Sequence, residues 1–354
     1  MNKKPIATNR KVVTFGEVML RLTAPDFRRF SQTNEFIATY GGSEANVAVS
    51  LANFGIPTEF VTRLPDNAMA QACIASLRAN GLGTEGIVLG GKRMGLYFLE
   101  SGASFRNSNV VYDREGSSFA TLRPGMIDWE KIFADAGWFH WSGIAASLSQ
   151  EGADACLEAL QTADRMGLTI SCDLNVRKKL WNYGRSVADV MLPLVQYSDV
   201  IFGAEPEYQE VFGITPVGFQ AVDTAYPLEL EGFEAFGQKI SDIVPRCRKV
   251  FLELRNTVTS NHNLLAAILY SDQTLKYTGI YDITHEVDRV GTGDAFVGGM
   301  IYGLLTYPDN DQKALEFALA ASALKNTVYG DFNQVTVKEV ESLMKGNTSG
   351  RVAR

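Results

Sequence analysis

The stretch that most constrains this chain runs from Asp288 to Phe296, where a polar, glycine-broken segment meets an apolar run. This pattern predicts a loop that opens a buried helix. Gly291 and Gly293 leave the backbone bare, so a ligand can approach its N–H groups closely. The first N–H groups of a helix have no partners within it, and the helix dipole favours an anion there. The stretch therefore predicts an anion-binding site.

Asp294 lies at the mouth of this predicted anion site. A carboxylate repels a phosphate, so it would add little to phosphate binding alone. It could act as a general base that takes the proton from a hydroxyl group attacking phosphorus. It could also be an acidic residue of the first helical turn that complements the helix dipole. These nine residues alone do not decide between the two interpretations.

Length and composition limit the classes of protein. The 354 residues suffice for one large α/β domain or two ordinary ones. The formal net charge of −7 argues against a general nucleic-acid binder. No apolar run approaches the roughly 18 residues of a membrane span, and no signal core follows the basic N-terminus. We therefore expect a cytoplasmic protein with neither nucleic acid nor membrane as a partner.

The cysteines and histidines are dispersed along the chain. No CxxC pair is present, so neither a zinc site nor a disulfide framework is indicated. Unpaired histidines are usually structural, and we expect that here. The residues are Cys73, Cys156, Cys172, Cys247, His140, His262 and His285.

The early segment Gly41-Gly42-Ser43 predicts a loop with Ser43 as the N-cap of the following helix. Asn46 shares the first turn of that helix with the glycine pair. Backbone and amide donors converge at such a place, which suits a small polar ligand. The alternative is a simple capped helix without a ligand.

Further along, strands and helices alternate, which is typical of a mostly parallel sheet covered on both faces. We find no internal repeat and no low-complexity segment. An inserted loop is predicted at Gly213 to Tyr226. Strands are predicted at 12–15, 58–62, 87–89, 138–141, 169–173, 199–202, 249–254, 264–270 and 275–278, and helices at 68–80, 151–166, 187–194, 206–212, 228–244, 312–326 and 337–344.

Two apparent nucleotide motifs are rejected on their context. Gly81 to Gly86 matches GxGxxG, but it follows a predicted helix and leads into a predicted strand, the reverse of the required order. Gly86 to Lys92 matches GxxxxGK, but Arg93 stands where a hydroxyl residue is needed and a predicted strand follows.

The segments Leu96–Glu100 and Asn109–Tyr112 predict two paired strands around a polar loop. Tyr97, Tyr112 and Arg114 lie on or beside these strands. Such strands could form a flap over a ligand site or an ordinary surface hairpin.

Charged and amide side chains follow several predicted strands of the main sheet. They occur in Asp173 to Arg177, in Glu205 to Glu207 and in the loop before Asp294. Ligands of open parallel sheets bind at the carboxyl ends of the strands. Each segment alone could cap a helix, but the three together favour a site for phosphate and Mg²⁺.

Two motifs carry a resemblance to the ribokinase-like (PfkB) carbohydrate kinases. They are Gly41 to Asn46 and Asp288 to Phe296, and the resemblance extends from Val12 to about Met344. It implies an α/β fold of three layers with a mostly parallel central sheet and a small β-sheet lid. It also implies one domain at about 10–345, with lid strands from about 18–40 and 94–120.

The resemblance implies ATP-dependent phosphorylation of a primary sugar hydroxyl. By this match Asp294 is the base, and Gly291, Thr292 and Gly293 form the anion hole. Kinases of this family often pair through their lids, which implies a homo-oligomer. The resemblance leaves open whether a monovalent cation is required.

Within the family, several segments are similar to 2-dehydro-3-deoxygluconate kinases. They are Gly95–Tyr97, Val111–Arg114, Asp173–Arg177 with Leu180-Trp181, and Lys325–Asn333. The implied sugar-binding residues are Gly41, Gly42, Asn46, Tyr97, Tyr112, Arg114, Arg177 and Asp294. The implied ATP-binding residues are Asn175, Arg255, Gly291, Gly293 and Asn326, and the implied metal residue is Glu207.

The chain departs from the family at two places. The NxxE motif that handles Mg²⁺ reads Ala204-Glu205-Pro206-Glu207, without its asparagine. The catalytic loop has Thr292 where alanine is usual, which we expect to matter little because the backbone N–H binds the anion.

Three functions are therefore compared. The first is a kinase for a sugar acid, in which arginines bind the carboxylate, and a neutral sugar would leave their positive charge buried without a partner. The second is a fructokinase or nucleoside kinase of the same fold. The third is a catalytically idle sugar-binding regulator, which Asp294 disfavours because a binding protein gains nothing from a carboxylate beside phosphate.

Overall fold

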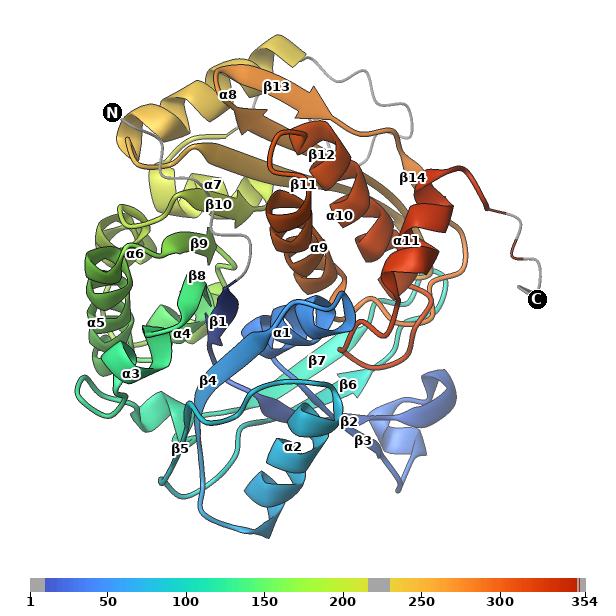
Figure 1. Cartoon of the computed structure of the whole chain (residues 1–354). Coiled ribbons are helices and arrows are strands. Elements are labelled where there is room, and N and C mark those ends of the chain that lie inside the picture. Colours follow the sequence, from blue (N-terminus) through green and yellow to red (C-terminus); the bar gives the residue numbers. More distant parts are fainter. Residues whose placement is uncertain (1–9, 216–229, 349, 351–354) are drawn as a thin grey trace.

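A ten-stranded sheet lies at the centre of the computed structural model, which describes residues 10–215, 230–348 and 350 (Figure 1). Its strand order is β13-β12-β11-β10-β9-β8-β1-β4-β5, and β14 also pairs with β12. The strands from β11 to β5 run parallel, and β12, β13 and β14 pair antiparallel. The strands are β1 Lys11–Phe15, β4 Thr58–Leu64, β5 Ile87–Leu89, β8 Ala136–Ser142, β9 Thr169–Asp173, β10 Val200–Gly203, β11 Lys249–Thr259, β12 His262–Ser271, β13 Thr274–Tyr277 and β14 Tyr281–Ile283.

Both faces of this sheet are covered by helices, because successive apolar residues of the central strands point to opposite faces. In β8, Trp138 belongs to the core of one face and Phe139 to the core of the other. Helices α3 to α8 pack on the Phe139 face, and α1, α2, α9, α10 and α11 pack on the opposite face. The helices are α1 Ser43–Asn53, α2 Ala68–Ala79, α3 Trp129–Phe133, α4 Gly143–Ser147, α5 Gln150–Met166, α6 Val187–Val195, α7 Glu205–Phe212, α8 Leu230–Ile243, α9 Thr292–Thr306, α10 Asp311–Lys325 and α11 Val337–Met344.

Helix α9 is held between α1 and α10 by close backbone contacts at glycine. A Cβ atom at Gly298 would lie 2.6 Å from the Cβ of Ser50 in α1. A Cβ atom at Gly303 would lie 2.7 Å from the Cα of Ala314 in α10. Protein interiors are close-packed, so these contacts fix α9 against α1 and thereby fix where its first turn lies.

A separate four-stranded sheet lies beside the central sheet, in the order β3-β2-β6-β7. Tyr97 in β6 and Tyr112 in β7 are paired in register and both line a pocket between the two sheets. The predicted lid is therefore confirmed as a small sheet over the carboxyl edge. Its strands are β2 Met19–Thr23, β3 Ile37–Gly41, β6 Leu96–Glu100 and β7 Asn109–Asp113.

Most predicted elements are confirmed, and β9 and α11 have the predicted bounds. The first rejected motif lies between α2 and β5, and the second contains β5 and is followed by β6, so neither opens a helix. The prediction that Ser43 is the N-cap of α1 is wrong. Gly42 occupies that position without a capping side chain, and the Ser43 hydroxyl is directed to Asp294 instead.

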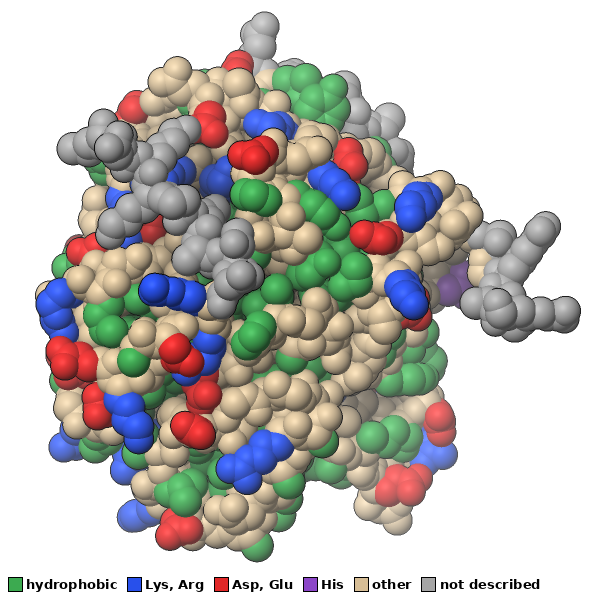
Figure 2. Space-filling view, in the orientation of Figure 1, with side chains coloured by type: hydrophobic (Ala, Val, Ile, Leu, Met, Phe, Trp, Pro, Cys, Tyr) green, Lys and Arg blue, Asp and Glu red, His purple; other side chains and the backbone are tan. Residues whose placement is uncertain are grey.

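Some predictions fall beyond what the structure describes. The inserted loop predicted to end at Tyr226 lies outside the described residues from position 216 onward. Within the described ranges, no helix combines the length and apolarity needed to cross a membrane. On the face that Figure 2 shows, acidic and basic side chains are interspersed rather than gathered by sign.

Candidate active site

A pocket of about 450 Å³ lies between the small sheet and the carboxyl edge of the central sheet. Parallel strands end at this edge, so loops far apart in the sequence converge there. The pocket brings together most of the residues predicted for substrate, ATP and metal. Those that line it are Gly42, Asn46, Tyr97, Tyr112, Arg114, Asn175, Arg177, Glu207, Arg255, Gly291, Thr292, Gly293 and Asp294.

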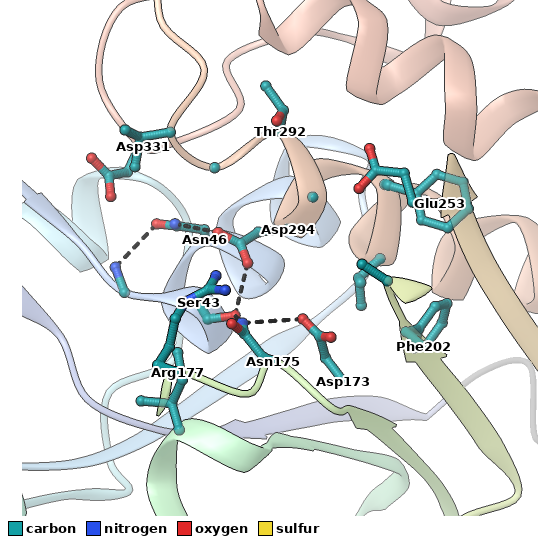
Figure 3. Close-up of a pocket in the computed structure, with 18 of the residues that line it drawn as sticks. Ser43, Asn46, Asp173, Asn175, Arg177, Phe202, Glu253, Thr292, Asp294 and Asp331 are labelled. Atoms are coloured by element: carbon teal, nitrogen blue, oxygen red, sulfur yellow. Dashed lines mark hydrogen bonds between the residues drawn. The ribbon is translucent and has the colours of Figure 1, made fainter. Parts of the chain in front are cut away.

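Asp294 lies in the first turn of α9 and is held by two donors from α1 (Figure 3). The Ser43 hydroxyl donates to its Oδ1 and the Asn46 amide donates to its Oδ2, each at 2.7 Å. Burial raises the pKa of Asp294 above its ordinary value, although both hydrogen bonds act in the opposite direction. The carboxylate is therefore oriented, and it is a stronger base than an exposed aspartate.

The hydrogen-bond chain continues from Ser43 to the end of β9. Asn175 donates to the Ser43 hydroxyl at 3.0 Å and to Asp173 Oδ2 at 3.2 Å. Burial, Glu207 and Asp294 together raise the pKa of Asp173 well above its ordinary value. Figure 3 shows Asp173, Asn175, Ser43 and Asp294 joined in this order.

The start of α9 has the geometry of an anion cradle. Gly291 is the N-cap residue in the left-handed region, with φ of 83°. A Cβ atom there would lie 2.1 Å from the carbonyl oxygen of Asp331, so only glycine fits. The N–H groups of the first turn follow directly, next to Asp294.

A buried ion-pair network ties the small sheet to this loop. Arg21 in β2 donates to Asp331 Oδ1 at 2.8 Å and to Asp288 Oδ2 at 2.5 Å. The N–H of Val290 donates to the other oxygen of Asp288, and the Tyr97 hydroxyl donates to Asp331. Burial alone would lower the pKa of Arg21, but its two carboxylate partners outweigh burial and the net shift is upward.

Arg114 lines the pocket, but its charge already has a partner. Its guanidinium forms a buried ion pair with Glu17, with Nη2 2.5 Å from Oε2. Our expectation that a neutral sugar would leave this charge without a partner is therefore wrong for Arg114. Arg177 is different, because its side chain is 50% exposed and lies 3.7 Å from Glu207 Oε1.

Glu207, the predicted metal residue, lies in the pocket wall, whereas Glu205 of the same motif does not. Its Oε2 accepts a hydrogen bond at 2.8 Å from the N–H of Ala204, the N-cap residue of α7. Burial raises the pKa of Glu207. Among the residues that the structure describes, no cluster of three or more His, Cys, Asp or Glu side chains could hold a metal.

Gly41 and Asn326 are the predicted site residues that do not line the pocket. A Cβ atom at Gly41 would lie 2.0 Å from a carboxylate oxygen of Asp331, so this glycine makes room for the network. The Asn326 side chain donates to the Ser322 carbonyl, and its own carbonyl accepts from Val287 N at 2.8 Å. Asn326 thus supports the loop before Gly291.

Arg21, Asp288, Asp331, Ser43 and Glu253 were not predicted as site residues. One sequence signal pointed to Arg21, which stands at an inward position of the apolar strand Met19–Thr23. A buried arginine needs a carboxylate partner. The sequence pattern does not tell which carboxylate, because Asp331 lies 310 positions away.

The arrangement can carry out one kind of chemistry well. An oriented base, Asp294, lies beside N–H groups that attract an anion, in a pocket between two sheets. A hydroxyl group hydrogen-bonded to Asp294 would face a phosphate bound at the start of α9. That is the geometry for moving a phosphoryl group to an alcohol.

Comparisons with known proteins agree with this chemistry. The solved 2-dehydro-3-deoxygluconokinase of Thermotoga maritima is 40% identical, with a TM-score of 0.88 over 95% of this chain and 100% of that one. The 2-dehydro-3-deoxygalactonokinase of Haloferax volcanii is 31% identical over 96% of this chain and 98% of its own length. Fructokinase-1 of Oryza sativa is 28% identical over 94% of this chain and 97% of its own length.

The family comparison covers nearly the whole chain. The model described as "pfkB family carbohydrate kinase" matches residues 9–336, which include both sheets and every pocket residue named above. With the fold, the anion cradle and the oriented Asp294 in agreement, this chain belongs to the pfkB family of carbohydrate kinases.

Proposed function

We propose that this sugar kinase transfers the terminal phosphoryl group of ATP to the primary hydroxyl of a sugar acid, with 2-dehydro-3-deoxy-D-gluconate as the substrate. The observation that carries the proposal is Asp294, held by Ser43 and Asn46 beside the anion cradle of α9. A base fixed next to an anion site suits phosphoryl transfer to a hydroxyl group.

In the proposed mechanism, Asp294 accepts the proton of the sugar hydroxyl as that oxygen attacks the terminal phosphorus of ATP. The N–H groups at Gly291 to Asp294 stabilise the charge on the transferred group. Ser43 and Asn46 keep the carboxylate aligned during the transfer. The small sheet covers the pocket and limits the access of water.

Kinases of this family use ATP and Mg²⁺. The pocket suits ATP because it offers an anion cradle and Arg255, whose Nη2 donates to Thr292 Oγ1 at 2.7 Å. With no three-carboxylate cluster among the described residues, Mg²⁺ would be held chiefly by ATP and water, near Glu207. Glu207→Gln is expected to raise the Mg²⁺ concentration for half-maximal rate, whereas Glu205→Gln should leave it unchanged.

Two observations support a sugar acid as the substrate. Arg177 lies in the pocket with half of its side chain exposed, so it can reach a carboxylate. The relatives at 40% and 31% identity are both named for 2-dehydro-3-deoxy sugar acids. These two acids share the 2-oxo acid end and differ elsewhere in the chain.

The second candidate is a fructokinase, which the similarity to the rice enzyme favours. The Arg114–Glu17 pair also favours it, because a neutralised arginine accepts a neutral sugar without loss. A non-enzymatic sugar-binding regulator is the third candidate, and the oriented Asp294 argues against it.

The test is a coupled assay of ADP release with equal concentrations of the two 2-dehydro-3-deoxy acids, fructose, ribose and adenosine. We expect kcat/KM for 2-dehydro-3-deoxy-D-gluconate to exceed that for fructose by at least tenfold. Equal use of fructose would replace the proposal with the fructokinase candidate. No ADP release with any acceptor would favour the regulator.

We also propose that the protein forms a homo-oligomer through the small sheet. Strands β3 and β7 are its edge strands, and unpaired strand edges invite further pairing. Its outer face is apolar and partly exposed, with Phe98 against Phe36 at 5.9 Å and Val111 46% exposed. A second copy of the chain would cover this surface.

A further inference from the structure

Among the residues that the structure describes, four arginines line the pocket, and three of them have partners. Arg114 pairs with Glu17, Arg177 lies near Glu207, and Arg255 lies 3.3 Å from Glu253 and donates to Thr292. Among the described residues, none forms a hydrogen bond or an ion pair with the guanidinium of Arg289, which also lines the pocket. The Arg289 side chain is partly buried, so its guanidinium has lost part of its hydration without gaining such a partner.

The surroundings of Arg289 make an anion the missing partner. Burial, followed by the positive charge of Arg255, lowers the pKa of Arg289, while Glu286 and Glu253 act in the opposite direction. Arginine remains charged in proteins, so the guanidinium groups of Arg289 and Arg255 are two positive charges in the same pocket. Two such charges repel each other unless an anion lies between them or beside both.

Thr292 connects the two arginines. Its hydroxyl accepts a hydrogen bond from Arg255 Nη2 at 2.7 Å and donates one to the carbonyl of Arg289 at 3.0 Å. An alanine at this position would leave both bonds unmade. The threonine hydroxyl thus orients Arg255 toward the segment that carries Arg289, at the start of the anion cradle.

We propose that Arg289 and Arg255 form a two-arginine clamp on the polyphosphate chain of the nucleotide, with Thr292 as its positioning residue. The clamp rests on the proposed function, because it assumes that the nucleotide phosphates lie at the start of α9. It gives the site a positive counterpart to the carboxylates Asp294, Glu207 and Glu253, which otherwise repel a polyphosphate. Planar guanidinium groups suit phosphate oxygens, since each can donate two parallel hydrogen bonds.

The clamp makes a prediction specific to phosphate. Loss of a charge-assisted hydrogen bond weakens binding by about 10- to 100-fold. Arg289→Met should therefore weaken MgATP and inorganic tripolyphosphate by that factor, and leave adenosine and the sugar acid within about twofold. Thr292→Val, which keeps the shape and removes the hydroxyl, should weaken MgATP by only about 2- to 13-fold, because Thr292 positions Arg255 and does not itself bind the phosphates.

The test is isothermal titration of the full-length protein with MgATP, tripolyphosphate, adenosine and 2-dehydro-3-deoxy-D-gluconate. Arg165→Met is the matched control, since it removes one surface arginine that is 60% exposed and pairs with Glu130. It should bind all four ligands like the unmodified protein. Arg289→Lys keeps the charge but cannot donate two parallel hydrogen bonds. Its affinity for MgATP and tripolyphosphate should lie between those of the unmodified protein and Arg289→Met.

Each outcome decides one claim. If Arg289→Met binds MgATP and tripolyphosphate as tightly as the control, the clamp is refuted and the proposed function stands. If adenosine binding falls in parallel with tripolyphosphate binding, Arg289 supports the fold of the site and the clamp is again refuted. If the unmodified protein binds neither MgATP nor tripolyphosphate, the proposed function fails and the clamp fails with it. Should Arg289→Met not fold, Arg289→Lys and Thr292→Val carry the same comparison.

Discussion

At the scale of single residues, the site depends on how buried carboxylates are compensated. Asp294 receives two hydrogen bonds, Asp331 and Asp288 share Arg21, and Glu17 pairs with Arg114. Buried charges are costly unless paired or hydrogen-bonded. Each compensation therefore fixes the position of a carboxylate in or beside the pocket.

Glu44 is a buried carboxyl group with a raised pKa, and it makes stability depend on pH. It is fully buried in α1 and hydrogen-bonded to Ser142, and burial raises its pKa to about 7. The unfolded chain releases this proton near the ordinary pKa of about 4.3, while the folded chain keeps it up to about pH 7. Between these values the unfolded state binds fewer protons, so folding stability falls as pH rises.

We therefore expect Glu44→Gln to remove a pH-dependent loss of stability. Relative to Glu44→Gln, the free energy of unfolding of the unmodified protein should fall from pH 5 to pH 7, by at most about 1.4 kcal/mol per pH unit. Urea denaturation at pH 5, 6 and 7 measures the difference, and Glu115→Gln, at an exposed position, is the control. Parallel pH profiles for the unmodified protein and Glu44→Gln would show that Glu44 does not titrate in this way.

Arg177 and its neighbour Lys178 allow a matched test of the sugar-acid proposal. Arg177 lines the pocket, whereas Lys178 is 71% exposed and pairs with Glu210. Because Arg177 is half exposed, we expect Arg177→Met to raise KM for the acid roughly tenfold, the low end for a charge-assisted hydrogen bond. KM for fructose and for ATP should change little, and Lys178→Met should change none of the three. Equal effects of both substitutions on the acid would remove Arg177 from the substrate site.

At the scale of elements, the small sheet is joined to the catalytic loop by Arg21. This residue of β2 reaches Asp288, whose other oxygen holds the N–H of Val290, and Asp331, which the Tyr97 hydroxyl of β6 also contacts. The sheet that covers the pocket and the loop before α9 thus share one buried network. A shift of either element disturbs the other.

Arg21→Met tests this connection. It leaves Asp288 and Asp331 buried without their cation, which is expected to cost about 3–5 kcal/mol of stability. Arg28→Met removes an exposed arginine between β2 and β3 and should change the free energy of unfolding by no more than about 0.5 kcal/mol. Chemical denaturation of both variants measures the difference. Equal stability of Arg21→Met and Arg28→Met would mean that the network does not hold the small sheet.

The elements show which features a sequence reveals and which it does not. The bounds of β9 were predicted because a β-branched, apolar run ends at Asp173 and is followed by polar residues. The prediction that Ser43 caps α1 was wrong because the Ser43 hydroxyl donates instead to Asp294, which lies 251 positions away in the sequence. Local patterns specify strands, helices and the anion loop, whereas the Arg21 and Arg114 ion pairs arise only when distant segments meet.

At the scale of the whole molecule, the carboxyl edge of one sheet and the inner face of another enclose the site. Helix α9, fixed by close contacts at Gly298 and Gly303, carries Asp294 to this edge. The outer face of the small sheet remains apolar, with Leu22, Phe98 and Val111 on it. The small sheet therefore faces the polar pocket on one side and carries apolar side chains on the other.

Sedimentation velocity at micromolar concentration tests the proposed assembly through the small sheet. The unmodified protein should sediment as more than a monomer of 38.8 kDa. Val111→Lys should shift it to the monomer because a charge would be buried in the interface. Met69→Lys, at a 50% exposed position of α2, is the control and should keep the assembly. A monomeric mass for the unmodified protein would contradict the proposal.

The central claim is that Asp294 is the base of a sugar-acid kinase, and Asp294→Asn tests it most directly. The amide keeps the size of the side chain but cannot take a proton, and a positioned base contributes about 10²–10⁴ in rate. We expect kcat with 2-dehydro-3-deoxy-D-gluconate to fall by that factor, while the Kd of the sugar acid by titration changes only a few-fold. A kcat close to that of the unmodified protein would contradict the account.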